Sequence, residues 1–112
     1  MQTLGTRLNS IIAANPNLQI SISLTDINSG NSFHYGVTAN YQAASTAKLL
    51  TATLYLHGVE QGRYELTDPM NGTSTKKQLQ LLIENSDNTA WLAFNDLIGR
   101  DNIVTWAAKH GI

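Results

Sequence analysis

The first apolar positions of the chain recur at helical spacing. Leu4, Leu8 and Ile11 lie three or four residues apart, which places them on one face of a helix. The Asn15-Pro16-Asn17 segment then ends the pattern, because proline cannot continue a helix and asparagine favours turns. The sequence therefore predicts an amphipathic helix over about residues 3–14, with its apolar stripe packed on a sheet.

Apolar and polar residues alternate over residues 18–25. Successive side chains of a strand point to opposite faces of a sheet, so this pattern predicts a strand with one buried face. The Asn28-Ser29-Gly30-Asn31 segment then supplies turn residues, and Phe33 and Tyr35 resume the alternation. Together these features predict a β-hairpin.

Helical patterns dominate the remainder of the chain. Thr75-Lys76-Lys77-Gln78 has the residue types of a capping box, which predicts a helix that opens at Thr75. The predicted helices run from Ser45 to Gly62, from Thr75 to the Ser86-Asp87-Asn88 segment, from that segment to Gly99, and from about Asn102 to His110. One helix, two strands and several further helices indicate an α+β fold.

The composition is that of an ordinary globular domain. The 112 residues are 42% hydrophobic and 13% charged, and the formal net charge is -1. A chain of this length can bury a modest core as one domain. No basic cluster indicates nucleic-acid binding, and no apolar run approaches the roughly 20 residues that span a bilayer.

Candidate metal ligands and export signals are few. The chain has no cysteine, which excludes disulfides, a thiolate nucleophile and cysteine-bound zinc. His34, His57 and His110 share no metal-ligand spacing, so we expect neither a metal nor a cofactor. Residues 1–10 lack the apolar stretch of a signal peptide, which leaves a cytoplasmic protein and a processed, exported protein as alternatives.

The Ser45-Thr46-Ala47-Lys48 segment carries the most informative chemistry. A serine hydroxyl is a weak nucleophile at neutral pH and needs a neighbouring base. Residues three apart lie on one face of a helix, so Lys48 can reach Ser45. A lysine acts as a base only where burial or a second cation lowers the reference pKa of about 10.4. Taken alone, the motif is more typical of a helix N-cap serine followed by an exposed lysine than of a catalytic pair.

A second motif, Ser86-Asp87-Asn88, favours the functional interpretation. Ser-x-x-Lys followed by Ser-Asp-Asn is the motif pair of penicillin-recognising serine enzymes, and the chain resembles class A β-lactamases and penicillin-binding proteins. The likeness extends through the flanking residues of Tyr41–Leu50 and Glu84–Ala90. Within the second motif, we expect Asp87 to fix the turn through its backbone contacts.

The resemblance implies roles for five residues. Ser45 is the expected acyl-accepting nucleophile, and Lys48 is the group expected to relay its proton. Ser86 resembles the hydroxyl that passes this proton to the leaving nitrogen. Asn88 resembles the amide that binds a carbonyl of the substrate side chain, and Tyr41 is expected at the mouth of the cleft.

The family's third motif, Lys-Thr-Gly or Lys-Ser-Gly on a late strand, is absent, as is an acidic ω loop of the class A type. The nearest string, Lys109-His110-Gly111, closes a helical pattern, and its glycine suits a helix C-cap. The resemblance thus implies one β-lactamase-like domain over residues 1–112, lacking the C-terminal strands, with a helix and hairpin in 1–40 and a helical subdomain in 41–112. The alternatives are a fragment, a fold completed by a second chain or a swapped protomer, and a reduced variant.

Two classes of function remain open. One is a serine hydrolase that opens β-lactam amides through an acyl-serine intermediate, or a related peptidase that acts on the acyl-D-Ala-D-Ala stems of peptidoglycan; without the third motif, we expect impaired turnover. The other is a non-catalytic scaffold or one fragment of a split enzyme. Glutaminases are a weaker third alternative, because the Ser86–Ala90 context argues against them. The resemblance implies a secreted or periplasmic protein.

Overall fold

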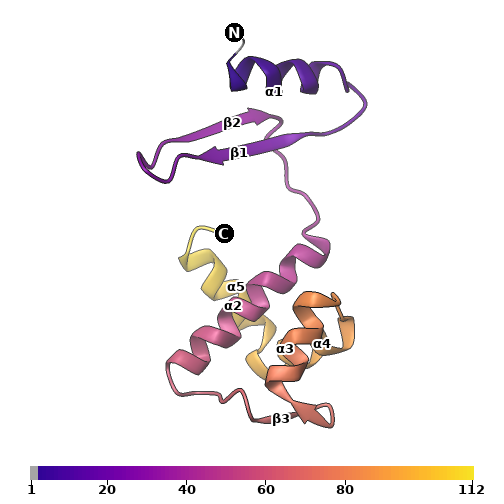
Figure 1. Cartoon of the computed structure of the whole chain (residues 1–112), viewed down its shortest axis with the longest axis vertical. Helices are drawn as coiled ribbons and strands as arrows, with labels where there is room; N and C mark the ends of the chain where they lie inside the picture. The colour runs from indigo at the N-terminus through magenta and orange to yellow at the C-terminus, as the bar shows by residue number, and fades with distance from the viewer. Residues whose placement is uncertain (1–2) are drawn as a thin grey trace. The chain divides into compact units, whose positions relative to one another are not determined.

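The computed structural model describes residues 3–112 and divides the chain into two compact units, with the boundary after Gln42 (Figure 1). The first unit contains α1 (Leu4–Ala13), β1 (Ser21–Thr25) and β2 (Ser32–Gly36). The second unit contains α2 (Ala47–Glu60), β3 (Pro69–Met70), β4 (Thr73–Ser74), α3 (Thr75–Glu84), α4 (Asn88–Ile98) and α5 (Arg100–Lys109).

In the first unit, α1 packs on β2. Thr3 caps the helix, because its Oγ1 accepts the Thr6 N–H at 3.3 Å, and the predicted helix is confirmed. Gly5 allows a close approach to the strand: a Cβ at this position would lie 2.9 Å from the Tyr35 hydroxyl oxygen. A larger residue would therefore require the Tyr35 side chain to shift.

The predicted hairpin is confirmed as an antiparallel pair in which Ile22 faces Tyr35 and Leu24 faces Phe33. The first strand is shorter than the alternation predicted, since it begins at Ser21. Leu18 is instead held in a turn, where its N–H donates to the Asn15 carbonyl at 3.0 Å. The helix end thus imposes a turn on residues whose side-chain pattern alone resembles a strand.

Asp26 organises the turn between β1 and β2. Its Oδ1 accepts the N–H groups of Asn28 at 2.9 Å and Ser29 at 3.4 Å, and its carbonyl accepts the Gly30 N–H at 2.7 Å. The Asn28 N–H holds the pKa of the Asp26 carboxyl below its ordinary value, with the hydroxyl and N–H of Ser29 acting in the same direction.

Acid should weaken this turn. Because the folded pKa of Asp26 is lowered, its contribution to stability is present above the ordinary value of 3.8 and is lost as the pH falls through the lower folded value. An amide NMR titration of Asn28 and Ser29 should show a midpoint below 3.8, and Asp26→Asn should abolish the transition. A midpoint at or above 3.8 in the unaltered chain would contradict the role of Asp26.

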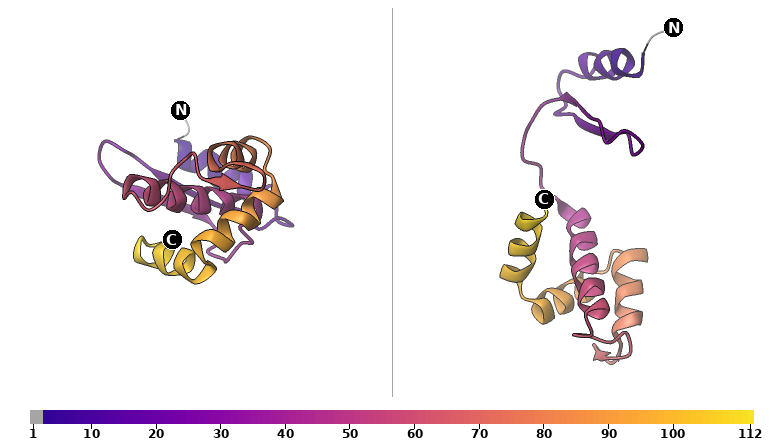
Figure 2. Two further views of the ribbon diagram at one scale, coloured as in Figure 1. Left: turned by 90° about the horizontal axis from the view of Figure 1, so that it is seen from below. Right: turned by 90° about the vertical axis from the view of Figure 1, so that its left-hand side faces the viewer.

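The core of the second unit lies where α2 meets α3 and α4 (Figure 2). Tyr55 and Phe94 are fully buried, with ring centroids 4.7 Å apart. The Tyr55 hydroxyl donates to the Glu65 carbonyl at 2.9 Å, and Thr75 Oγ1 donates to the same oxygen at 2.8 Å. Burial raises the pKa of Tyr55 above its ordinary value. This core fixes the start of α3 against the middle of α2.

The predicted capping box is wrong by one residue. Ser74 is the N-cap of α3, since its Oγ accepts the Lys77 N–H at 3.3 Å. Thr75 is instead the first helical residue, and its hydroxyl is drawn into the core by the Glu65 carbonyl. Tertiary packing therefore overrides the local capping pattern.

The sequence interpretation also missed the β3–β4 hairpin. Its turn is Asn71-Gly72, and both residues have positive φ, 49° and 75°. This is the residue pair that a type I′ hairpin turn favours. The hairpin positions Gln78, whose side chain accepts from Asn71 Nδ2 at 3.3 Å and donates to Thr73 Oγ1 at 2.8 Å.

The ends of the last helices agree with the predicted stops. Gly99, with φ of 86°, separates α4 from α5, so that α5 begins two residues earlier than predicted. Lys109-His110-Gly111 lies at the end of α5, where Gly111 has φ of 74°, and it forms no strand. None of the helices in residues 3–112 has the length and apolarity needed to cross a membrane.

Candidate active site

Ser45 lies in a 3₁₀ turn, Ala44–Thr46, that leads directly into α2. The turn is closed by Ala43, whose carbonyl accepts the Thr46 N–H at 3.0 Å and also the Thr46 hydroxyl. Ala44 before the serine has a positive φ of 46°. This backbone leaves Ser45 exposed at the N-terminal end of the helix.

Lys48 is in the first turn of α2 and is buried, with 4% of its surface exposed. Its Nζ donates to the Ser86 carbonyl oxygen and, at 3.0 Å, to Ser86 Oγ. An ammonium group loses much hydration on burial and needs such acceptors in return. The side chain of Lys48 therefore ties the start of α2 to the turn between α3 and α4.

Ser86 completes a chain of hydrogen bonds between the two motifs. Its Oγ–H donates to Ser45 Oγ at 3.0 Å, so Lys48 Nζ, Ser86 Oγ and Ser45 Oγ are linked in series. Ser86 has φ of 52°, in the left-handed region that non-glycine residues seldom occupy. The turn thus holds a strained residue at the centre of the motif contacts.

Asp87 holds this turn in place. It is the N-cap of α4, and its Oδ1 accepts the Ala90 N–H at 2.7 Å. Its own N–H donates to the Leu81 carbonyl at 3.1 Å, at the end of α3. These contacts are those expected of a residue that fixes the turn.

The other predicted residues are not drawn into the hydrogen-bond chain. Asn88 is the first residue of α4 and is exposed; within residues 3–112 its side chain makes no hydrogen bond. Tyr41 belongs to the first unit, and 49% of its surface is exposed. Substrate binding by Asn88 and Tyr41 stays a prediction. Glu84 is also exposed, where it accepts from Gln80 Nε2 at 2.8 Å.

A second polar chain, which sequence reasoning missed, lies beside Lys48. Trp91 Nε1–H donates to Thr51 Oγ1 at 3.0 Å, and Thr51 Oγ1 donates to Asn95 Oδ1 at 3.0 Å. The Trp91 ring centroid is 5.8 Å from Lys48 Nζ. Trp91 and Thr51 lie 40 residues apart in the sequence, so residue spacing alone does not predict their contact.

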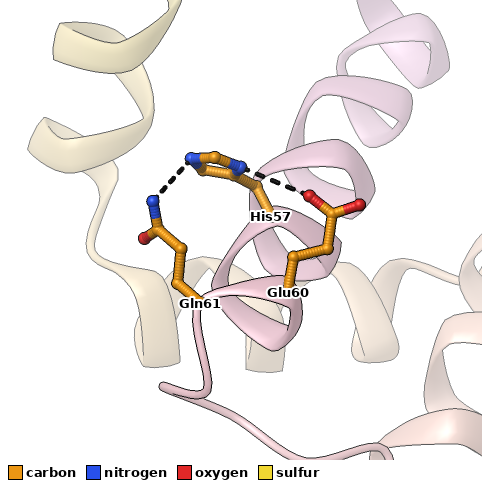
Figure 3. Close-up of polar contacts among 3 residues, drawn as sticks. All are labelled: His57, Glu60 and Gln61. Carbon is orange, nitrogen blue, oxygen red and sulfur yellow. Dashed lines mark hydrogen bonds and ion pairs between the residues drawn. The ribbon is translucent and has the colours of Figure 1, made fainter.

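His57 and His110 make contacts that do not involve Ser45, Lys48 or Ser86. His57 is near the C-terminal end of α2, where its Nδ1 is 3.6 Å from Glu60 Oε2 and its Nε2 is 3.0 Å from Gln61 Nε2 (Figure 3). His110 stacks on Trp106 in α5, with ring centroids 3.9 Å apart. Residues 3–112 contain no cluster of three side chains arranged to bind a metal ion.

Comparison with known families identifies the family of the chain. A sequence model described as the β-lactamase enzyme family matches residues 3–112. The chain belongs to the β-lactamase enzyme family. The resemblance inferred from the Ser45–Lys48 and Ser86–Asn88 motifs is thereby confirmed.

A solved structure gives the same answer for the fold. It is a variant of the last common ancestor of Gram-negative bacteria class A β-lactamase, bound to the transition-state analogue 5(6)-nitrobenzotriazole. The two chains are 20% identical and superpose with a TM-score of 0.82, over 94% of this chain and 48% of the other. The predicted α+β β-lactamase-like fold is confirmed, and the chain spans about half the length of the structure it matches. No curated protein compared with the chain matches it.

In this β-lactamase-family chain, two substitutions at Ser86 can measure the backbone strain separately from the loss of its hydroxyl group. Ser86→Gly should be more stable than Ser86→Ala by about 1 kcal/mol, because glycine adopts a positive φ without a Cβ penalty. Both variants lose the hydroxyl that joins Lys48 to Ser45. Chemical denaturation measures the difference in the free energy of unfolding.

Asp96, an exposed residue within α4, provides the matched control. There, the glycine variant should be less stable than the alanine variant by about 1 kcal/mol, since glycine is a poor helix former. If Ser86→Gly also proved the less stable of its pair, Ser86 would not be strained in solution.

Proposed function

We propose that Ser45 is the nucleophile of a β-lactamase-type serine hydrolase site, acylated by the strained amide of a β-lactam. The observation that carries the proposal is the series of hydrogen bonds, 3.0 Å each, from Lys48 Nζ to Ser86 Oγ and from Ser86 Oγ to Ser45 Oγ. It provides a nucleophile that is exposed to substrate and joined through one hydroxyl to a buried amine.

The reaction requires both hydrogen bonds, Lys48 to Ser86 and Ser86 to Ser45, to reverse their donor and acceptor roles. In the structure, Lys48 donates to Ser86 and Ser86 donates to Ser45, the arrangement suited to an ammonium. When Lys48 is a neutral amine, the Ser45 O–H can donate to Ser86 Oγ, and the Ser86 O–H can donate to Lys48 Nζ. Ser45 is then a hydroxyl whose proton has a path to a base, as nucleophilic attack demands.

Acylation then follows in two steps. Ser45 Oγ bonds to the carbonyl carbon, and the negative charge that develops on the carbonyl oxygen lies near the N-terminal end of α2, where the helix dipole favours it. The C–N bond breaks next, and the proton returns from Lys48 through Ser86 to the leaving nitrogen. An acyl ester remains on Ser45, and with a β-lactam the opened ring keeps its nitrogen in the same adduct.

The rate of this reaction in the 112-residue chain should be low. The third motif that the family places on a late strand is not in the sequence, and the second oxyanion donor normally comes from that part of the fold. Loss of one oxyanion donor costs about 10²- to 10³-fold in rate. The sequence likewise shows no acidic ω loop to activate a deacylating water. We therefore propose slow acylation, slower turnover and a long-lived acyl ester.

Intact-mass spectrometry after incubation with a penicillin tests this function. The chain should gain the full mass of one penicillin, because ring opening releases no fragment, and Ser45→Ala should gain none. A parallel incubation with an acyl-D-Ala-D-Ala peptide should add the peptide mass without its last alanine if the site is of the peptidase type. A folded chain that gains no mass with either probe would exclude Ser45 as an independent acylation site.

One observation favours a second candidate function, that of one half of an assembled fold. The β1–β2 sheet has two strands, so each has one edge without a strand partner within residues 3–112. Exposed strand edges readily pair with another chain, and a second chain or a swapped protomer could supply such strands. Light scattering of the purified chain tests this candidate, since a complex of two copies would favour assembly and a monomer at all concentrations would count against self-association.

A further inference from the structure

Lys48 is a buried ammonium without a carboxylate partner. Within residues 3–112, the one ion pair joins His57 to Glu60. The acceptors of Lys48 Nζ are the carbonyl and the hydroxyl of Ser86, whereas an ammonium has three N–H donors. Because the Lys48 residue is 4% exposed, its charge needs further compensation.

The ring of Trp91 supplies that compensation. Its centroid lies 5.8 Å from Lys48 Nζ, within the distance over which the negative face of an aromatic ring attracts a cation. Tryptophan is the strongest aromatic partner for a cation, and the attraction increases where water is excluded. The ring is therefore a favourable neighbour of the charge in addition to Ser86.

The orientation of the ring is fixed by buried polar groups. Its Nε1–H donates to Thr51, which donates in turn to Asn95. Thr51 and Asn95 are 2% and 7% exposed, so these hydrogen bonds are shielded from competing water. Thr51 lies one turn beyond Lys48 on α2, while Trp91 and Asn95 lie on α4. The chain thus joins the helix that carries the lysine to the helix that follows Ser86.

Open space lies beside the ring. A cavity of about 440 Å³ is lined by Trp91 together with apolar side chains such as Leu50, Ile103 and Val104. A small residue in place of Trp91 would join this space to the surroundings of Lys48. The flexible lysine stem could then leave Ser86, because no carboxylate within residues 3–112 holds it there.

We propose that Trp91 is a positioning residue, which holds the Lys48 ammonium against Ser86 and thereby keeps Ser86 joined to Ser45. It acts through Lys48 and does not touch the reacting atoms. The kinetic consequence rests on the proposed function of Ser45, but the positioning itself does not. The two can therefore be tested by separate measurements on the full chain.

The first measurement is the NMR signal of the lysine ε-methylene groups. The chain has four lysines, Lys48, Lys76, Lys77 and Lys109, and Lys48→Met assigns the signal of interest. The ring current of Trp91 should shift the Lys48 protons away from the other three. Trp91→Leu should abolish that difference, and Trp91→Phe should keep part of it. Trp106→Leu, which removes the other tryptophan, should leave it unchanged.

The second measurement is the rate of acylation by penicillin in the same variants. Trp91→Leu should lower the rate by up to about 30-fold, the rate equivalent of one desolvated cation–π contact. Trp91→Phe retains an aromatic face and should stay within about 2-fold of the unaltered chain. This rescue separates the ring face from the indole N–H, which Phe lacks. Circular dichroism confirms that each variant is folded.

The outcomes separate the two proposals. If the unaltered chain is not acylated but the Lys48 signal shifts and depends on Trp91, the proposed function fails while the positioning role is supported. If the chain is acylated but Trp91→Leu changes neither the signal nor the rate, the positioning role is overturned and the function stands. A Lys48 signal that coincides with those of the exposed lysines in the unaltered chain would also overturn the positioning role.

Discussion

Burial of the Lys48 ammonium is the constraint on which the candidate site depends. The charge loses its water on entering the protein, and Ser86 provides two oxygen acceptors in exchange. To do so, Ser86 must present its carbonyl and hydroxyl on the same side, in a backbone conformation with positive φ. The packing of Tyr55 and Phe94 holds α2 and α4 together and so supports this turn against its strain.

Local chemistry made much of this predictable from the sequence. Leu4, Leu8 and Ile11 share a helix face, and the alternation around Ile22 gives a half-buried strand, because both patterns depend on near neighbours. The Ser45 and Ser86 motifs could be paired because the family pattern specifies both. Their spacing within the sequence, however, contains no information on how far apart the two hydroxyl groups lie.

The features that the sequence did not specify depend on tertiary contacts. Thr75 has the residue type of a helix cap, but the Glu65 carbonyl draws its hydroxyl into the core and Ser74 caps the helix instead. Trp91 has the spacing of a core residue, and its contact with Thr51 requires α4 to pack beside α2. In each case a polar group is satisfied by a residue distant in sequence, which periodicity cannot report.

The central claim is that Lys48 is withdrawn from solvent into the contact with Ser86, and reductive methylation of lysines tests it most directly. Lys76, Lys77 and Lys109 are exposed, whereas Lys48 is 4% exposed. Peptide mapping of the folded chain should find those three modified and Lys48 protected, and all four should react after unfolding in denaturant. Modification of Lys48 at the rate of the exposed lysines in the folded chain would contradict the account.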